Sequence, residues 1–269
     1  MIINSTGFSA EHSVIVSIVM PLYNSSAYVA SSIESVLSQS YKNWELILVD
    51  DFSTDNTLLI IQSYLNSDNR IKLIKSELNV GAAVARNMAI EKASGKYLCF
   101  LDSDDIWLPE KLATQVSYME QNNVLFSFMA YFKVDADDNK IGCVHVPDIV
   151  GYNDLLRTCS IGCLTAMFNA EVLGKQMMPL LRKRQDYGLW LKLIKLSGKA
   201  YGINVPLSCY RVHSESISSN KFNAAKYQWR IYREVEGLNI LKTSYYFTTY
   251  MVYGILKTKV PRLYSLLIK

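Results

Sequence analysis

Several motifs that would classify an unfamiliar sequence quickly are missing from this one. No GxGxxG motif follows its first apolar run, which leaves a dinucleotide site of the Rossmann type without support. A GxxxxGK[ST] loop, the usual phosphate cradle of nucleotide hydrolases, does not occur either. The GxSxG turn that carries a nucleophilic serine is also absent. These absences exclude three common classes of α/β enzyme.

Cysteine pairs and long apolar runs are scarce as well. The five cysteines show neither disulfide-like nor zinc-site spacing, which favours free thiols in a reducing compartment. The first 13 residues contain no lysine or arginine, so we expect no signal peptide. The longest uncharged stretch near the C-terminus, 243–256, has 14 residues, whereas a membrane-spanning helix needs about 20. We therefore expect a cytoplasmic protein without a spanning helix.

Charge is unevenly distributed along the chain. The net charge of +4 over 269 residues is too small to indicate a nucleic-acid partner. Residues 221–269, however, carry nine Lys/Arg against two Asp/Glu, and half of the 18 tyrosines lie after residue 200. This shift predicts one working domain, residues 1–219, followed by a basic, tyrosine-rich helical tail, residues 220–269.

Apolar strands and amphipathic helices alternate over the first hundred residues. Strands are expected at 13–20 (ended by Pro21), 44–49, 71–74 and 97–101, and helices at 25–39, 54–66 and 81–93. Further elements are expected as a strand at 125–134, a hairpin turn at 135–139, a strand at 141–146, a helix at 185–197, one edge strand at 200–210, and helices after 219. The alternation predicts an α/β protein with a mixed, mostly parallel sheet flanked by helices.

Acidic residues follow two of the predicted parallel strands directly. Asp50 and Asp51 come after the second strand, and Asp102, Asp104 and Asp105 after the fourth. Ligands of open α/β sheets bind beyond the carboxyl ends of the strands, where these carboxylates would repel one another. Mg²⁺ or Mn²⁺ would relieve that repulsion, with substrate phosphates as further ligands. The alternative is that these residues only cap helices and form turns.

Several further motifs stand in a fixed order around these acids. They are VSIVMPLYN at 16–24, LVDDFSTD at 48–55, NVG at 79–81, ARN at 85–87, FLDSDDIW at 100–107, QDYGLW at 185–190 and YRVH at 210–213. Together they cover about residues 14–219 and resemble glycosyltransferase family 2. The resemblance implies the GT-A fold, a nucleotide-diphosphate-sugar donor, a divalent metal ion, and inversion at the anomeric carbon.

The resemblance implies a nucleotide site at the first two motifs. Pro21, Tyr23 and Asn24 would line the nucleotide pocket. Asp51 would accept a hydrogen bond from the base, which suits the imide N–H of uracil. The glycine that is usual in the second motif is Phe52 in this chain, so the base pocket departs from the family pattern at that position.

The later motifs imply the diphosphate and metal site. Asp102 and Asp104 match the family's D-x-D motif, so these residues and Asp105 would contact ribose and metal, either Mn²⁺ or Mg²⁺. Arg211 and His213 are similar to a late Arg-x-His element that contacts diphosphate or metal. For His213, a surface histidine without a role is the alternative.

The proposed base comes from the same resemblance. Asp186 matches the second acid of the family's E-D or Q-D pair and would take the proton of the acceptor hydroxyl, because inverting transfer needs a carboxylate opposite the leaving diphosphate. Arg86 either contacts the nucleotide or makes a structural ion pair. The basic run 182–184 either holds a phosphate or anionic acceptor, or is a solvated turn.

The sequence therefore predicts a metal-dependent, inverting glycosyltransferase of polysaccharide biosynthesis, using a UDP-sugar and a saccharide or polyprenyl-diphosphate-linked acceptor. A non-catalytic scaffold that binds sugar nucleotides or membrane with the same fold is the main alternative. A nucleotidyltransferase is a third hypothesis, but this chain lacks the basic, glycine-rich loop that such enzymes usually carry after the first strand. Aromatic and basic residues in the tail favour peripheral contact with the inner face of the cell membrane. Packing of the tail on the domain or on a second subunit is the alternative.

Overall fold

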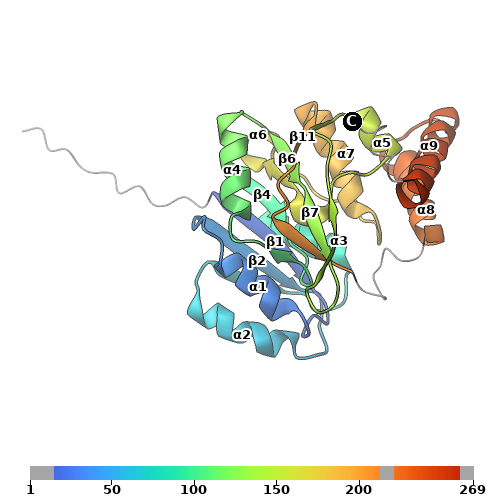
Figure 1. The fold of residues 1–269 in the computed structure, drawn as a ribbon. Helices are drawn as coiled ribbons and strands as arrows, with labels where there is room; N and C mark the ends of the chain where they lie inside the picture. Colours follow the sequence, from blue (N-terminus) through green and yellow to red (C-terminus); the bar gives the residue numbers. More distant parts are fainter. Residues whose placement is uncertain (1–14, 213–220, 261–269) are drawn as a thin grey trace, which may run out of the picture.

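The computed structural model describes residues 15–212 and 221–260. It shows a central sheet flanked by helices, with a helical C-terminal segment beside it (Figure 1).

An eight-stranded sheet forms the centre, in the order β3-β2-β1-β4-β10-β6-β11-β9. The strands are β1 Val16–Leu22, β2 Trp44–Asp50, β3 Ile71–Lys75, β4 Tyr97–Phe100, β6 Phe126–Met129, β9 Ile149–Val150, β10 Met167–Asn169 and β11 Ala200–Ile203. β1 lies parallel to β2 and β4, and β2 lies parallel to β3, whereas β10 is antiparallel to both of its neighbours. The predicted mixed, mostly parallel sheet is confirmed.

Helices cover both faces of this sheet, because successive side chains of a strand point to opposite faces. Ile18 and Met20 pack with α1 Val29–Leu37, α2 Thr57–Ser67 and α4 Lys111–Gln121. Val19 and Ile47 belong to the other core, with α3 Ala82–Lys92, α5 Tyr152–Arg157 and α7 Gln185–Ser197. The shorter helical pieces are η1 Cys163–Thr165 and α6 Ala170–Leu173. Burial on both faces explains why β2 reads as a nearly continuous apolar run.

A second sheet has four strands in the order β5-β12-β7-β8. Its strands are β5 Ile106–Trp107, β7 Tyr131–Val134, β8 Lys140–Val144 and β12 Ser208–Arg211. The predicted single strand over 125–134 is wrong, because the chain leaves the large sheet at Met129 and enters the small one at Tyr131. The predicted hairpin after it is confirmed, since β7 and β8 pair antiparallel and Asp135 accepts hydrogen bonds within the turn.

The predicted single edge strand over 200–210 is also wrong. β11 lies inside the large sheet, between β6 and β9, and β12 lies inside the small sheet. Residues 204–207 separate the two strands. The Asn204 side chain accepts from the N–H of Val146 and donates to its carbonyl, and Pro206 has no N–H with which to continue a ladder. Pro21 does not end the first strand, because it pairs with Val49 inside β1.

The C-terminal segment consists of α8 Lys221–Arg230, a π-helix Ile231–Val235 and α9 Ile240–Lys259. Ile231 and Tyr232 are fully buried, and the Tyr232 hydroxyl donates to the carbonyl of Leu156 at 2.5 Å. The Tyr246 hydroxyl donates to Asn153 at 2.8 Å. One side of this segment therefore packs on α5 and α7. Across 15–212 and 221–260, every helix is too short or too polar to cross a bilayer.

Candidate functional site

The carboxyl ends of β1, β2 and β4 meet at one edge of the large sheet, which we call the acidic edge. The backbone N–H of Asn24, after β1, donates to the Ser53 hydroxyl at 3.0 Å, and the Asn24 side chain accepts from the N–H of Thr54 at 2.8 Å. The hydroxyls of Ser25 and Ser103 lie 2.7 Å apart. These contacts join the loops that carry three of the motifs. The loops after β1, β2 and β4, which the sequence predicted to lie at one edge, are therefore in contact with one another.

Asp51 is buried and anchors the neighbouring loop. Its two carboxylate oxygens accept the backbone N–H groups of Val80 and Gly81 at 2.7 and 2.8 Å. A carboxylate oxygen has two lone pairs, so these bonds leave acceptor capacity for a ligand. Contact of Asp51 with a base stays a prediction.

Phe52 takes the place of the usual glycine at a position where the backbone is left-handed, with φ of 66°. Glycine adopts that conformation without steric cost, which explains the family preference. The ring of Phe52 and that of Tyr23 are both about half exposed at the ends of adjacent strands. Together they give the acidic edge an aromatic rim, a feature that the sequence analysis did not single out. Pro21 lies just below this rim, within β1.

Arg86, on α3, makes an ion pair of 2.5 Å with Asp102 after β4. Of the two roles expected for Arg86, the structural ion pair is therefore present. Burial opposes the charge of Arg86, but Asp102, Cys163 and Asp186 outweigh it and raise the pKa of the guanidinium. The Nε of Arg86 is buried and has no hydrogen-bond partner among the described residues. Arg86 thus lies in the field of both Asp102 and the predicted base.

Asp105 is almost fully buried below the partly exposed Asp104. Burial raises the pKa of Asp105 strongly, and the carboxylates of Asp104 and Asp102 raise it further. A cation beside such a cluster would relieve this unfavourable charge, so the residues fit a divalent metal. Within the described part of the chain, no three His, Cys, Asp or Glu side chains form a complete metal site. His213, the third predicted ligand, lies outside the described residues.

Arg211 is buried under the turn that carries Asp104. Its Nε donates to the Asp104 carbonyl at 2.9 Å, and its guanidinium pairs with Asp138 at 2.7 Å. The backbone N–H of Arg211 donates to the Asp105 carboxylate at 3.0 Å. Arg211 therefore connects β12, the β7–β8 turn and the loop after β4 that carries Asp102, Asp104 and Asp105, which we call the acidic loop. Its predicted contact with a nucleotide is not tested by these contacts.

Asp186 lies in the first turn of α7 and is partly exposed. It interacts electrostatically with Arg86, Cys163 and Arg184, and Cys163 in turn with Asp102. Asp186 and the acidic loop therefore border the same region. Cys163 and Arg184 lie near Asp186, and no motif of the sequence indicated such a place for Cys163.

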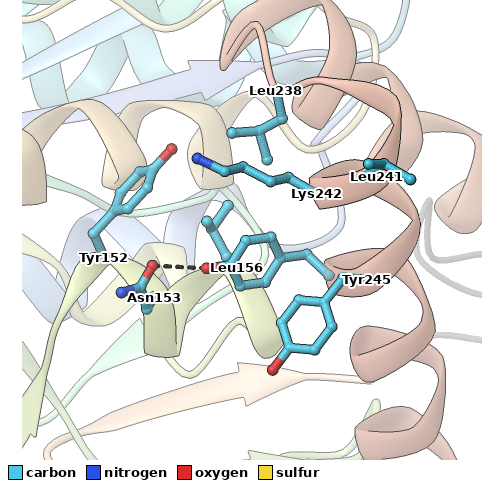
Figure 2. A pocket seen from close by; sticks show the side chains of 8 residues that line it. Tyr152, Asn153, Leu156, Leu238, Leu241, Lys242 and Tyr245 are labelled. Atoms are coloured by element: carbon cyan, nitrogen blue, oxygen red, sulfur yellow. Dashed lines mark hydrogen bonds between the residues drawn. The ribbon is translucent and has the colours of Figure 1, made fainter.

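A pocket of about 350 Å³ lies elsewhere, between α5 and α9 (Figure 2). Tyr152, Leu238 and Lys242 contribute to its lining, which contains no carboxylate and none of the predicted site residues. The acidic edge and this pocket are therefore separate features.

Comparison with known proteins identifies the family. The family model "Glycosyl transferase family 2" matches residues 17–166. The chain is 43% identical over 237 residues to TuaG of Bacillus subtilis, named as a teichuronic acid biosynthesis glycosyltransferase, covering 88% of this chain and 94% of TuaG. It is also 43% identical over 246 residues to the Escherichia coli UDP-Glc:alpha-D-GlcNAc-diphosphoundecaprenol beta-1,3-glucosyltransferase WfgD, covering 90% and 94% of the two chains.

Solved structures agree with the fold. S. aureus TarS in complex with UDP superposes with a TM-score of 0.68 at 20% identity, over 95% of this chain and 75% of that one. The mannosyltransferase PcManGT of Pyrobaculum calidifontis, in complex with GDP-Man and Mn²⁺, gives a TM-score of 0.63 at 16% identity, over 94% and 78% of the two chains. With its GT-A fold, a family model over more than half of its length, and relatives matched almost end to end, the chain belongs to glycosyltransferase family 2 and is a glycosyltransferase.

Proposed function

We propose that this glycosyltransferase moves a sugar, with inversion and with the help of Mn²⁺ or Mg²⁺, from a UDP-sugar to a lipid-linked saccharide in bacterial surface-polysaccharide assembly. The observation that carries the proposal is the meeting of three motif loops at the acidic edge, with Asp186 bordering the same region. The names of TuaG and WfgD support the polysaccharide context, and the UDP complex of TarS supports the donor class.

The uridine half of the donor is assigned to the edge between β1 and β2. Asp51 is fixed there by two backbone N–H groups, so its remaining lone pairs point in set directions. The exposed rings of Tyr23 and Phe52 offer flat apolar surface to a base. Pro21 and Asn24 are assigned to the same side of the uridine site. Asn24 contributes by forming the hydrogen bonds that hold the loop after β2.

The diphosphate half is assigned to the loop after β4. Asp104 and Asp105 would hold the metal ion, with His213 as a further proposed ligand, and the brace of Arg211 keeps their turn in place. When bound, the ion supplies Lewis-acid stabilisation of the charge that develops on the leaving diphosphate. Asp102, neutralised by Arg86, is left for the ribose or for the metal's water ligands.

Asp186 is assigned as the general base. It accepts the proton of the acceptor hydroxyl while that oxygen bonds to the anomeric carbon, and the bond from this carbon to the diphosphate oxygen breaks on the opposite face. One displacement of this kind inverts the configuration. The products are the glycosylated acceptor and UDP, with the proton on Asp186.

Contact with the cell membrane is assigned to the outward face of α9. Leu241 is 79% exposed and Ile255 59% exposed, Met251 and Val252 are exposed beside them, and the helix contains no acidic residue. Lys242 and Lys259 are exposed near its two ends. An apolar helix face with flanking bases suits the headgroup layer of anionic lipids. That location would bring the enzyme to a lipid-linked acceptor.

The membrane assignment is tested by flotation with phosphatidylglycerol-containing vesicles. Leu241→Ser combined with Ile255→Ser should abolish co-flotation, while Leu59→Ser, at a comparably exposed leucine of α2, should not. Unchanged flotation of the double variant contradicts the assignment. A change from dimer to monomer in gel filtration instead identifies the face as a contact between two copies.

The donor site is tested first by calorimetric titration with UDP, with GDP as control, in Mn²⁺ and after chelation. UDP binding that weakens about tenfold or more on chelation supports the metal–diphosphate site. Binding of equal strength without metal contradicts it. Transfer is then assayed with UDP-glucose, the donor in the name of WfgD, and a GlcNAc-diphosphate lipid. UDP binding without transfer from any of a panel of UDP-sugars favours the scaffold alternative.

A further inference from the structure

The residue before the helix of the predicted base has an unusual backbone. Arg184 immediately precedes α7 and is left-handed, with φ of 63° and ψ of 18°. A left-handed conformation is unfavourable for a residue with a side chain, so other contacts must hold it. Asp186 follows two residues later, in the first turn of the helix. The direction in which α7 presents Asp186 therefore depends on how Arg184 is held.

The hydrogen bond that holds Arg184 comes from the C-terminal segment. Its Nη2 donates a hydrogen bond to the hydroxyl of Tyr250, on α9. The guanidinium also lies over the rings of Tyr250 and Tyr187, at 5.1 and 5.9 Å from their centroids. These rings offer their negative faces to the cation, which favours the charged form. A residue 66 positions away in the sequence thus fixes the start of α7.

Two further residues in the first turn of α7 are held by neighbouring parts of the chain. The Tyr187 hydroxyl donates to the carbonyl of Leu155 at 3.0 Å. A Cβ added to Gly188 would lie 2.5 Å from Pro179 and 3.2 Å from the Cδ1 of Ile231 in the π-helix, so the backbone there is closely packed. Tyr187 is thus tied to α5, and Gly188 is packed between Pro179 and the C-terminal segment.

The carboxylate of Asp186 itself lacks such support. Among the described residues no hydrogen bond orients it, and its interactions with Arg86, Cys163 and Arg184 are electrostatic. A carboxylate without a hydrogen-bonded neighbour takes its position from its backbone. The geometry of the turn from Arg184 to Gly188 is then the means by which the protein places the base.

We infer that Tyr250 and Arg184 are positioning residues of the transfer reaction, through which the C-terminal segment orients Asp186 toward the acceptor hydroxyl. The inference rests on the proposed role of Asp186 as the base. It makes α9 part of the catalytic unit in addition to its proposed contact with lipid. The two functions use different sides of the helix, since Tyr250 is partly buried whereas Leu241 and Ile255 are exposed.

The test compares two tyrosines of the same helix. Tyr250→Phe keeps the ring but removes the acceptor of the Arg184 bond, whereas the control Tyr246→Phe removes a bond to Asn153 on α5. UDP release from UDP-glucose with a GlcNAc-diphosphate lipid gives kcat and KM, and calorimetry gives the Kd of UDP. Tyr250→Phe should lower kcat about tenfold with the Kd and KM for the donor within twofold, because small displacements of a base reduce rate strongly. Tyr246→Phe should stay within twofold in kcat.

Coupling to the base distinguishes positioning from a general loss of structure. In an Asp186→Asn background, Tyr250→Phe should have no further effect on the residual rate, because there is no base left to orient. Arg184→Lys, which keeps the charge and a donor, should recover part of the rate that Arg184→Ala loses. A kcat of Tyr250→Phe within twofold of the parent overturns the inference, and so does an equal loss in both backgrounds. If the parent transfers no sugar, or if Asp186→Asn is fully active, it is the proposed function that fails.

Discussion

Replacing Asp186 by asparagine separates its predicted role as a base from any role in folding. The change keeps the shape of the side chain and removes its charge. Asp186 is partly exposed and makes no hydrogen bond within the described residues, so besides its attraction to Arg86 and Arg184 the fold loses the interaction of a carboxylate with a helix N-terminus. That interaction is worth about 0.3–1 kcal/mol. In a chain of this size it lowers the melting temperature by roughly 1–4 °C.

The expected effect on transfer is much larger. Removing a general base lowers the rate by a factor of about 10²–10⁴. This corresponds to roughly 2.7–5.5 kcal/mol of transition-state stabilisation. Within the described residues Asp186 makes no hydrogen bond to the loops assigned to uridine, so the Kd of UDP should stay within about twofold of the parent value.

The assay measures UDP release and labelled product from UDP-glucose and a GlcNAc-diphosphate lipid, with UDP binding followed by calorimetry. Asp154→Asn is a matched control, because it makes the same change in the first turn of α5, away from the acidic edge. The control should keep more than half of the parent rate. Transfer by Asp186→Asn within tenfold of the parent would show that another group is the base. A parallel loss of UDP binding would show that Asp186 belongs to the donor site instead.

Two further predictions concern buried charges. The Nζ of Lys111 is buried 3.7 Å above the ring of Trp107 without a hydrogen bond in the described part of the chain, and burial lowers the pKa of Lys111 from 10.5 to about 8. Between those values the unfolded chain keeps a proton that the folded chain has lost, so the unfolding free energy should rise with pH by up to about 3 kcal/mol. Lys111→Met should lack this rise in urea titrations at pH 7.5, 9 and 10.5, and parallel curves for both proteins contradict the reasoning. Arg211→Met should lose about 2–4 kcal/mol of stability, because it leaves the carbonyls of Asp104 and Ala136 without their donor. A urea midpoint equal to that of the parent would show that the brace contributes nothing.

The sequence predicted the acidic edge well because its signals are local. A buried apolar run followed directly by aspartate specifies both a strand and the residues at its carboxyl end. The parallel order of β1, β2 and β4 then brings Asp51 and Asp102 to the same side. The helix over Gln185–Ser197 was predicted correctly for a similar reason, since its apolar spacing is regular throughout.

The division of the middle strands between two sheets could not be read in this way. Residues 125–134 and 200–210 are mostly apolar, and their few polar residues do not by themselves show that the chain changes sheet there. The change depends on distant contacts, such as the Asn204 side chain on the backbone of Val146. The buried position of Arg211 is equally non-local, because its partners come from the turns at 104 and 135–138.

The C-terminal segment also depends on non-local contacts that its sequence pattern does not reveal. Composition predicted helices rich in tyrosine and basic residues but could not say which tyrosines would face the protein. Tyr245 is exposed, whereas Tyr250, five residues later, bonds to Arg184, two residues before the proposed base Asp186. Some tyrosines of such a helix pack against the protein and others face the solvent. The sequence pattern does not distinguish the two kinds, because the difference depends on where α7 lies.

The acids of the edge and Asp186 differ in how the protein compensates their charge, and this difference is the argument for assigning them different proposed roles. Asp51 is held by backbone N–H groups, and Asp102 is neutralised by Arg86. Asp105 is buried beside other carboxylates, so its charge is the one that a cation would relieve most. Asp186 has electrostatic neighbours but no hydrogen bond in the described residues, which leaves its lone pairs open to a hydroxyl proton. Four carboxylates in one region are therefore suited to four tasks, namely holding a loop, balancing a guanidinium, binding a metal ion and accepting a proton.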